Sequence, residues 1–261
     1  MPSVLERIDR ARHTISFVSH FAEPDSFALT ALAQWLDTSP GGMATTAEDG
    51  KGMESGTEGT TPSNPVQQLA AHIRDQLGAG PFSQADGWTH MGAVISDASF
   101  QARSRYKATI LPRILALQTA WPDAATVKGF QARLATDDLA TAMNFHHARK
   151  VAKAHNVTDL LAAHGVDTRD DLRAWLDIQP NRAALRAVKD VGPKTVDYLG
   201  NLVGGSQIAV DVHLRAFAAE AGVTDLRYEQ LRTTYEHAAA LLGHEPGGME
   251  HAVWRLKAGV S

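Results

Sequence analysis

Residues 182–217 read RAALRAVKDVGPKTVDYLGNLVGGSQIAVDVHLRAF, and this stretch decides the fold. Apolar residues recur at helical spacing on both sides of a short polar turn. They are Ala184, Leu185 and Val188 before the turn, and Val196, Leu199 and Val203 after it. Gly192 is expected to take backbone angles that other residues resist, and Pro193 suits the first turn of the second helix, where its missing N–H is not needed. Residues 182–203 therefore predict a helix-hairpin-helix.

The start of the second hairpin helix is a predicted anion-binding site. Backbone N–H groups of its first turn point out of the hairpin, and the positive end of the helix dipole lies in the same place. A DNA phosphate is the ligand expected there. The residues predicted to make this contact are Lys189, Val191, Gly192 and Thr195.

Two ionisable residues lie beside the hairpin. Lys194 falls in the first turn of the second helix, and Asp211 follows the Gly204-Gly205 loop and an apolar run, directly before another amphipathic pattern. A lysine in this place can be a nucleophile, or it can contact only phosphate or solvent. Aspartate is favoured at helix N-caps, so Asp211 can be a cap, a catalytic carboxylate, or both.

The motifs VGPKT (191–195) and IAVDVH (208–213) together resemble the helix-hairpin-helix Gly-Pro-Asp superfamily of DNA glycosylases, and most of all its endonuclease III branch. A weaker similarity extends over residues 88–257. The sequence departs from the family at Asp190, where the family has glycine, and in the loop before Asp211, which lacks the family's proline.

The resemblance implies an all-α fold of two helical lobes with a DNA cleft between them. One lobe would be a helical barrel that ends in the hairpin 182–203, and the other would be built from both ends of the chain. The residues favour the same class, because no strand-like alternation of apolar and polar positions occurs along the sequence.

In this family a lysine and an aspartate carry the reaction, so the resemblance implies that Lys194 and Asp211 are catalytic. Breaking the bond between base and deoxyribose places positive charge on the sugar, which a carboxylate stabilises. A neutral lysine can attack C1′, form a Schiff base and cleave the strand by β-elimination. A lysine with an ordinary pKa of about 10.4 is almost fully protonated at pH 7, so its surroundings must lower that pKa.

Three functions are consistent with these residues. The first is a DNA glycosylase that removes a damaged, mismatched or modified base and is also a lyase at the resulting abasic (AP) site. The second is a monofunctional glycosylase in which Asp211 activates water. The third is a non-catalytic helix-hairpin-helix DNA-binding protein in which Lys194 only contacts phosphate.

Composition limits the cofactors. The chain has no cysteine, which excludes disulfides and the iron–sulfur cluster of many family members. Its twelve histidines show no metal-ligand spacing such as HExxH, so no catalytic metal is predicted. The resemblance implies only a structural potassium or sodium ion at the hairpin, nearest the carbonyls of Val188 and Val191.

The net charge of −4 is unevenly distributed. Residues 1–65 contain four basic and nine acidic side chains, which leaves residues 66–261 close to neutral. Double-stranded DNA is the predicted partner, so its binding face must be local. The candidate cations are Arg103, Arg105, Lys107, Arg182, Arg186, Lys189 and Lys194. No signal peptide or membrane span is predicted, and a monomeric, cytoplasmic, nucleoid-associated protein is expected.

The pattern divides the chain into three parts. Residues 1–37 predict an appended helical hairpin, residues 38–64 are a Gly/Ser/Thr/Glu-rich linker, and residues 65–261 form the predicted glycosylase domain. Within that domain, helices are expected over 100–117, 147–155 and 158–164, among others. Predicted helix caps are Asn64, Asp123, Thr168 with Asp171, Asn181 and Asp211.

Overall fold

The computed structural model describes residues 64–259, and in this range every regular element is a helix. No β-strand occurs between these two residues, so the predicted all-α class is confirmed for them. The predicted hairpin over 1–37 and the linker before Asn64 lie outside the described residues. No helix in the described part of the chain has the length and apolar character needed to cross a bilayer.

The elements follow one another with short connections. In chain order they are α3 (Pro65–Leu77), α4 (Met91–Phe100), the π-helical turn η1 (Tyr106–Ile110), α5 (Leu111–Ala120), the 3₁₀ turn η2 (Pro122–Ala125), α6 (Val127–Thr136), α7 (Leu139–Ala142), α8 (Ala148–Ala163), α9 (Arg169–Leu176), α10 (Gln179–Ala187), α11 (Pro193–Leu202), α12 (Val212–Glu220), α13 (Tyr228–Leu242) and α14 (Pro246–Lys257).

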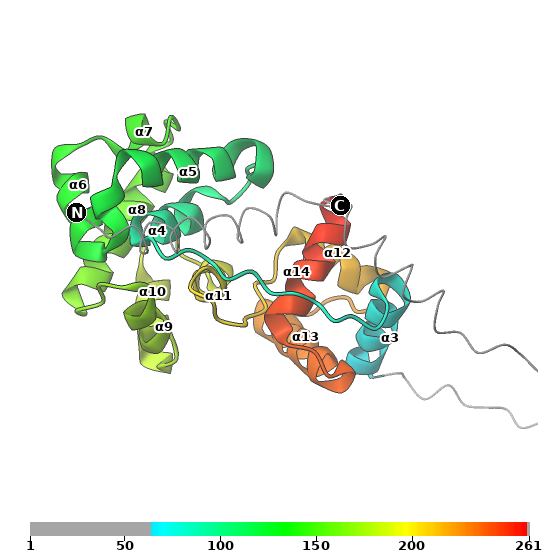
Figure 1. Cartoon of the computed structure of the whole chain (residues 1–261). Helices are drawn as coiled ribbons and strands as arrows, with labels where there is room; N and C mark the ends of the chain where they lie inside the picture. The colour runs from blue at the N-terminus through cyan, green and yellow to red at the C-terminus, as the bar shows by residue number, and fades with distance from the viewer. Residues whose placement is uncertain (1–63, 260–261) are drawn as a thin grey trace, which may run out of the picture.

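Two hydrophobic cores divide these helices into two groups (Figure 1). The first helical group, α4 to α11, closes around a core drawn from one continuous stretch, 88–203. The second helical group combines α3 with α12, α13 and α14, so its core joins two distant parts of the chain. The segment between α3 and α4 crosses from one group to the other, and α11 lies where the groups meet (Figure 1). Residues on α11 are therefore placed to contact both groups.

The expected helix over 100–117 is interrupted. α4 ends at Phe100, a turn follows, and α5 begins only at Leu111, with Pro112 in its first turn. The Lys150 Nζ donates to the Phe100 carbonyl (2.6 Å) and the Ala102 carbonyl (2.8 Å). A side chain from α8 thus satisfies carbonyls that a continuous helix would have used, and this allows the chain to turn.

The two helices expected over 147–155 and 158–164 are one helix, α8. Thr158 does not cap a second helix, because its hydroxyl donates to the Ala154 carbonyl one turn earlier (2.8 Å) and is buried. The predicted cap at Asn181 is also wrong: α10 begins at Gln179, and the Asn181 amide donates to the Trp175 carbonyl (3.0 Å). At Asn181 a bond back to the end of α9 replaced the predicted cap.

The predicted cap at Asp123 is wrong as well, because α6 begins at Val127 and the Thr126 hydroxyl accepts from the Gly129 N–H (3.0 Å). The remaining predicted caps in the described residues are confirmed. Asn64 accepts from the Val66 N–H (3.0 Å) at the start of α3. Thr168 and Asp171 form a reciprocal capping box on α9. These caps depend only on neighbouring residues, which explains why the sequence was sufficient to predict them.

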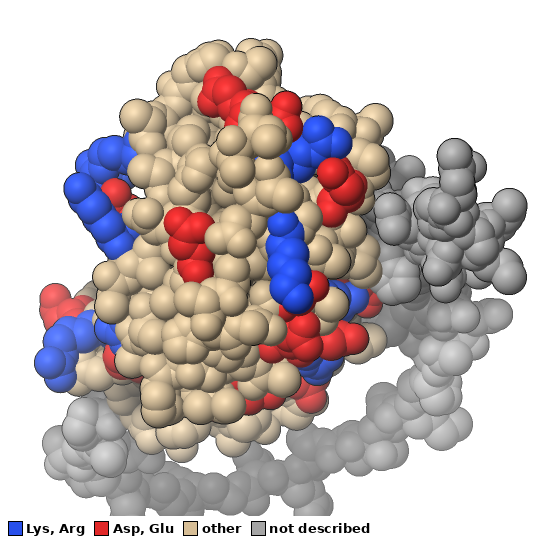
Figure 2. All heavy atoms as spheres, turned by 90° about the vertical axis from the view of Figure 1, so that its left-hand side faces the viewer, with Lys and Arg blue, Asp and Glu red and all other residues tan. Residues whose placement is uncertain are grey.

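Charged side chains on one face of the first helical group are mixed. Seen from the side that carries α6, α9 and α10, Lys and Arg residues alternate with Asp and Glu over the described surface (Figure 2). Such a face has no extended positive field that would attract DNA.

Candidate active site

The hairpin turn takes its unusual backbone conformation at Asp190 and not at Gly192. Asp190 has φ 67°, in the left-handed region, whereas Gly192 is extended with φ −101° and ψ 175°. The prediction for Gly192 is therefore wrong in this respect. Aspartate tolerates the left-handed region better than most residues, and Arg149 on α8 forms an ion pair with the Asp190 carboxylate. This pair also lowers the pKa of Asp190.

The backbone donors of the hairpin are partly used within the protein. The Val191 N–H donates to the Val188 carbonyl (3.1 Å), and the Thr195 N–H donates to the Gly192 carbonyl (3.0 Å). Among residues 64–259 no acceptor meets the Gly192 N–H, which lies at the N-terminus of α11. A Cβ atom placed on Gly192 would meet no heavy atom within 4 Å. This donor therefore faces open space where an anion can approach.

The other predicted contacts at the hairpin differ in exposure. Lys189 is exposed and Thr195 is part-buried, while the Val191 side chain is buried. The carbonyls of Val188 and Val191 are neutral oxygen ligands of the kind that a potassium or sodium ion accepts. Such an ion would hold the turn and would supply no reactive group.

Lys194 lies in the first turn of α11 and is part-buried. Its Nζ lies 4.3 Å from the centre of the Tyr198 ring, one helical turn later, in a cation–π contact. Burial lowers the pKa of Lys194, and the negative charges of Asp211, Glu250 and Asp97 oppose this shift. Lys194 is therefore a lysine whose ammonium form is destabilised by its surroundings.

Asp211 is the N-cap of α12, as predicted. Its Oδ1 accepts from the His213 N–H (2.8 Å) and the Leu214 N–H (3.0 Å). Both bonds use the same oxygen, and no described residue donates to Oδ2. The cap therefore fixes the carboxylate and leaves one oxygen for another partner, while the helix dipole favours its negative charge.

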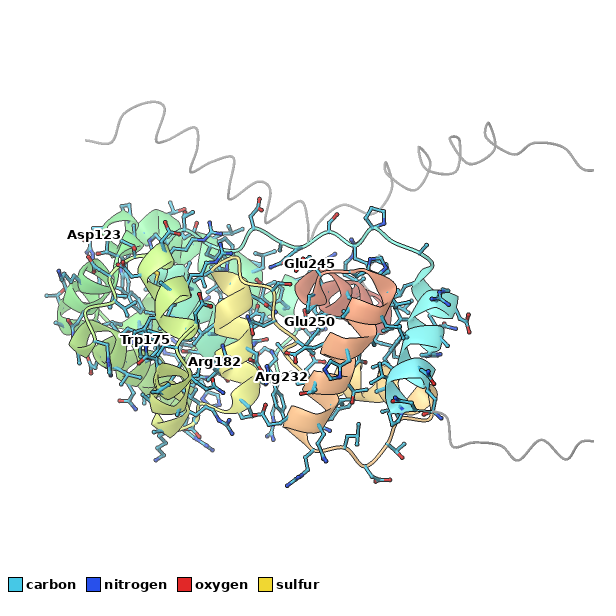
Figure 3. The ribbon with its side chains drawn as sticks, turned by 90° about the horizontal axis from the view of Figure 1, so that it is seen from below. Asp123, Trp175, Arg182, Arg232, Glu245 and Glu250 are labelled. Atoms are coloured by element: carbon cyan, nitrogen blue, oxygen red, sulfur yellow. The ribbon has the colours of Figure 1, made fainter. Side chains whose placement is uncertain are left out.

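Glu250 on α14 is a third member of this site, which the sequence did not indicate. The pKa of Glu250 is raised to about 8: burial raises it, the charge of Lys194 opposes the rise, and the charge of Asp211 adds to it. The shifts of Lys194 and Glu250 each include the charge of the other. Glu250 lies between α14 and α11 in Figure 3, whereas Glu245 lies at the start of α14. The only signal in the sequence is an acid among the small and apolar residues of α14.

An aromatic side chain fixes the approach of α14. The Trp254 ring packs edge-on against the rings of Tyr106 (6.5 Å) and His213 (6.4 Å). Trp254 is one helical turn after Glu250, and His213 is two residues after Asp211. Trp254 therefore holds the Glu250 side of α14 against η1 and the first turn of α12.

A buried carboxylate, that of Asp97, is linked to Lys194 through Tyr198. Asp97 on α4 is fully buried and accepts hydrogen bonds from the Trp88 Nε1–H (2.9 Å), the Tyr106 hydroxyl (2.8 Å) and the Tyr198 hydroxyl (3.1 Å). Burial raises its pKa to about 6, and the three donors oppose the rise. The Tyr198 ring also makes the cation–π contact with the Lys194 ammonium. This hydrogen-bond network therefore links the position of Lys194 to the core of the first helical group.

We expect Asp97→Asn to change how stability depends on pH. The folded-state pKa of about 6 lies above the ordinary value of 3.8, so the folded state binds this proton more tightly than the unfolded state. The resulting stabilisation is full below pH 3.8 and is lost as the pH rises through about 6, in total about 3 kcal/mol. In urea unfolding from about pH 4 to about pH 7, the wild-type free energy of unfolding should fall by that amount relative to the variant. A constant difference between the two proteins would contradict this.

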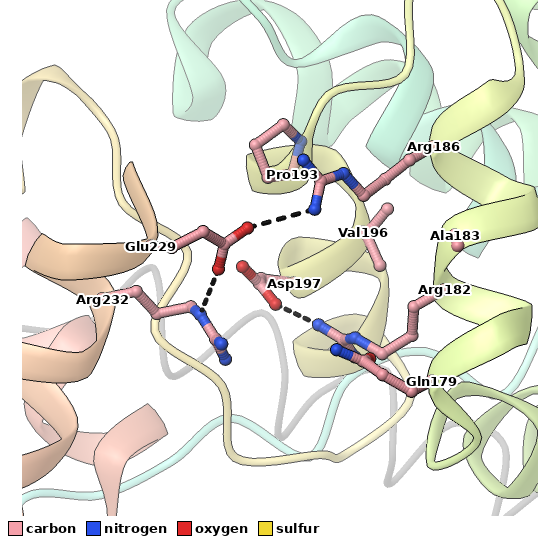
Figure 4. A pocket seen from close by; sticks show the side chains of 9 residues that line it. All are labelled: Gln179, Arg182, Ala183, Arg186, Pro193, Val196, Asp197, Glu229 and Arg232. Atoms are coloured by element: carbon pink, nitrogen blue, oxygen red, sulfur yellow. Dashed lines mark hydrogen bonds and ion pairs between the residues drawn. The ribbon is translucent and has the colours of Figure 1, made fainter. Parts of the chain in front are cut away.

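A pocket of about 120 Å³ lies elsewhere on α11, where α10 and α13 approach it (Figure 4). Its lining residues are Gln179, Arg182, Ala183, Arg186, Pro193, Val196, Asp197, Glu229 and Arg232. Neither Lys194 nor Asp211 lines it. The guanidinium groups are paired with acids, in Arg182–Asp197, Arg186–Glu229 (3.1 Å) and Arg232–Glu229 (3.1 Å). Arg232 also pairs with Glu236, so each guanidinium of the pocket has an acidic partner. The Arg186–Glu229 pair joins α10 of the first helical group to α13 of the second.

Comparison with protein-family models and with curated proteins found no match for this sequence. The described residues contain no group of three or more His, Asp and Glu side chains placed to share a metal ion. The candidate site is thus defined by three ionisable residues whose charges affect one another. It consists of Lys194 on the hairpin helix, Asp211 capping α12, and Glu250 on α14.

Proposed function

We propose that this protein is a helix-hairpin-helix Gly-Pro-Asp DNA glycosylase that removes a damaged, mismatched or modified base and also cleaves the resulting abasic site. The observation that carries the proposal is the part-buried Lys194, which has a lowered pKa and lies within the electrostatic reach of Asp211. The two helical groups that meet at α11 support the two-lobed fold implied by the motifs. Neither residue alone would favour catalysis over a cap or a phosphate contact.

In this proposal DNA binds along the hairpin, and the Gly192 N–H donates to a phosphate oxygen. The target nucleotide leaves the base stack and enters between the two helical groups, which costs least for a damaged or mispaired base. Asp211, fixed by its two backbone hydrogen bonds, presents Oδ2 to the sugar. Its negative charge stabilises the positive charge that develops on the sugar as the bond to the base breaks.

Lys194 then attacks C1′ through its neutral amine and forms a Schiff base with the opened sugar. Removal of a C2′ proton from this intermediate leads to β-elimination of the 3′ phosphate and strand cleavage. Burial supplies the destabilised ammonium that the attack requires. The Tyr198 ring keeps the Nζ in place without forming a hydrogen bond that would consume its lone pair.

A duplex panel tests the proposal. Duplexes that contain uracil, thymine mispairs, oxidised pyrimidines, 8-oxoguanine, alkylated purines or modified cytosines are incubated with the protein, and products are separated before and after alkali. A strand break without alkali supports the bifunctional reaction. Base release that needs alkali for strand scission would favour a monofunctional enzyme that uses Asp211 and water. Binding without release from any duplex would contradict the proposal and favour a non-catalytic protein.

We expect Gly192→Ala to weaken DNA binding without loss of stability. The backbone angles of Gly192 suit any residue and its Cβ position is open, so the free energy of unfolding should change by less than about 0.5 kcal/mol. The added methyl group would stand where a phosphate approaches the Gly192 N–H, and we expect Kd for a duplex to rise about tenfold. Fluorescence anisotropy at fixed salt measures Kd. An unchanged Kd would exclude the hairpin as the phosphate contact.

A further inference from the structure

The proposed reaction needs two proton transfers for which Lys194 and Asp211 alone do not account. The Lys194 ammonium must lose a proton before it attacks, and the departing base must gain one on its nitrogen. Asp211 already accepts two backbone N–H bonds on Oδ1 and is assigned to the charge that develops on the sugar. A second carboxyl group near Lys194 would solve both problems.

Glu250 is the group in the right place. Trp254, one turn later on α14, packs against His213 beside Asp211 and against Tyr106, which shares Asp97 with Tyr198. The Tyr198 ring in turn contacts the ammonium of Lys194 at 4.3 Å. These contacts place the part of α14 that bears Glu250 near the first turns of α11 and α12, and the charges of Glu250, Lys194 and Asp211 act on one another there. Among residues 64–259 no hydrogen-bond donor or ion-pair partner within bonding distance holds the Glu250 carboxylate in its charged form.

The surroundings of the pair disfavour charge on both partners. Glu250 faces ionisable groups from three other helices. They are Lys194, Asp197 and Tyr198 on α11, Asp211 at the start of α12, and Tyr235 on α13. Burial raises the pKa of Glu250 to about 8 and lowers that of Lys194, so both shifts favour an amine beside a neutral carboxyl group.

We propose that Glu250 is the proton partner of Lys194: it takes the proton that Lys194 gives up and then donates it to the departing base. This inference rests on the proposed glycosylase function and assigns the general acid of that reaction. Glu250 and Asp211 then have different roles because their surroundings differ. Glu250 is the general acid, and Asp211 is the carboxylate that stabilises positive charge on the sugar.

The proton and electron balance is complete. The Lys194 ammonium passes a proton to the Glu250 carboxylate, and the resulting amine forms a bond to C1′. This first proton transfer is complete before DNA binds, so the resting site holds a neutral Lys194 amine and a protonated Glu250. The bond between C1′ and the base breaks with its electron pair on the base nitrogen, which takes the proton from Glu250. A proton then moves from the Lys194 nitrogen to O4′ as the sugar ring opens, which leaves the protonated Schiff base. Glu250 ends as a carboxylate and needs no outside oxidant or reductant.

Glu250→Gln tests the inference because it keeps the shape of the side chain but carries no proton to transfer. Glu245→Gln is the matched control, since Glu245 is exposed, lies one turn earlier on α14 and caps the helix without a side-chain hydrogen bond. The first measurement is the rate of base excision at pH 7 on the panel duplex that the wild-type protein cleaves fastest. We expect Glu250→Gln to lower this rate about 100-fold or more, as for loss of a general acid, and Glu245→Gln to leave it unchanged.

The second measurement uses a duplex with one abasic site, which has no base to protonate, and traps the lysine adduct with borohydride. If Glu250 is a carboxylate paired with a protonated Lys194, the amide removes the charge that stabilises the ammonium. The adduct rate at pH 7 then rises about tenfold or more, and this overturns the inference. If Glu250 already holds the proton, the two proteins trap at rates within about threefold of each other.

The outcomes separate the inference from the function on which it rests. A slow excision rate with an adduct rate close to wild type supports Glu250 as the proton partner. Excision by Glu250→Gln within about threefold of wild type overturns it while the glycosylase function stands. No wild-type adduct on abasic-site DNA and no wild-type excision overturns both. Thermal unfolding of each variant shows whether a lost rate reflects lost folding.

Discussion

Lys194→Gln is expected to abolish the borohydride-trapped adduct with abasic-site DNA, a loss of at least about a thousandfold. The reason is chemical: a glutamine amide has no nucleophilic lone pair, so no covalent bond to C1′ can form. The fold should persist, because the substitution removes a destabilised charge from a part-buried place and retains most of the side-chain volume. The adduct is quantified as a slow-migrating band on a denaturing gel.

The control for this variant is Lys189→Gln. Lys189 lies in the same turn, is exposed, and has no part in the proposed covalent step. We expect it to trap at the wild-type rate once DNA is saturating, with a Kd raised only modestly because one phosphate-contacting charge is lost. An adduct that survives Lys194→Gln would show that a different amine attacks, and the assignment of the nucleophile would then fail.

Asp211→Asn is expected to lower the rate of base excision by about 100- to 10,000-fold. Asparagine caps helices about as well as aspartate, so the bonds from the His213 and Leu214 N–H groups can persist and the fold with them. What is lost is the negative charge that faces the sugar in the transition state. Single-turnover kinetics on a panel duplex measure the excision rate, and urea unfolding measures stability.

The design separates the two roles of Asp211. If it were only a helix cap, Asp211→Asn would leave both excision and stability near wild type, which would contradict a catalytic role. Asp138→Asn is the matched control, because Asp138 caps α7 through the Ala140 and Thr141 N–H groups and is exposed. Asp211→Ala should in addition lose about 1 kcal/mol of stability, because alanine cannot accept the capping bonds.

The same substitution should affect the abasic-site adduct differently. The charge of Asp211 raises the pKa of Lys194, so its removal favours the neutral amine. Asp211→Asn should therefore lower the rate of base excision but raise the fraction of neutral Lys194 amine that forms the abasic-site adduct. This contrast would not arise if the variant were simply misfolded, because both rates would then fall together.

The position of Asp190 has a consequence for the proposed DNA binding. The family that the motifs resemble has glycine there, and in this protein an aspartate takes the left-handed conformation and places a carboxylate at the hairpin. Arg149 compensates its charge through an ion pair across to α8. The pair keeps a negative charge from facing the phosphate alone, and it places the Arg149 guanidinium beside the turn. The departure from the family at this residue is thus matched by a second residue 41 positions earlier in the chain.

Part of this molecule follows from the sequence alone. Helical periodicity and the proline in the hairpin determined α10 and α11, and the absence of alternating patterns determined the helical class. Local capping chemistry determined the ends of α3, α9 and α12, including the role of Asp211 as a cap. These features depend only on residues close together in the sequence, so the sequence alone is sufficient to predict them.

The rest was decided by contacts between residues far apart in the chain. Periodicity could not show that the Lys150 side chain, on α8, donates to the Phe100 carbonyl at the end of α4. It also could not show that the Asn181 amide donates to the Trp175 carbonyl on α9 and does not cap α10. Nor could it bring Glu250 within electrostatic reach of Lys194, because this requires α14 to pack on α12 and η1 through Trp254. Residue type alone gives lysine and glutamate ordinary pKa values. Only the packed structure removes the water around them and brings one charge close enough to act on the other.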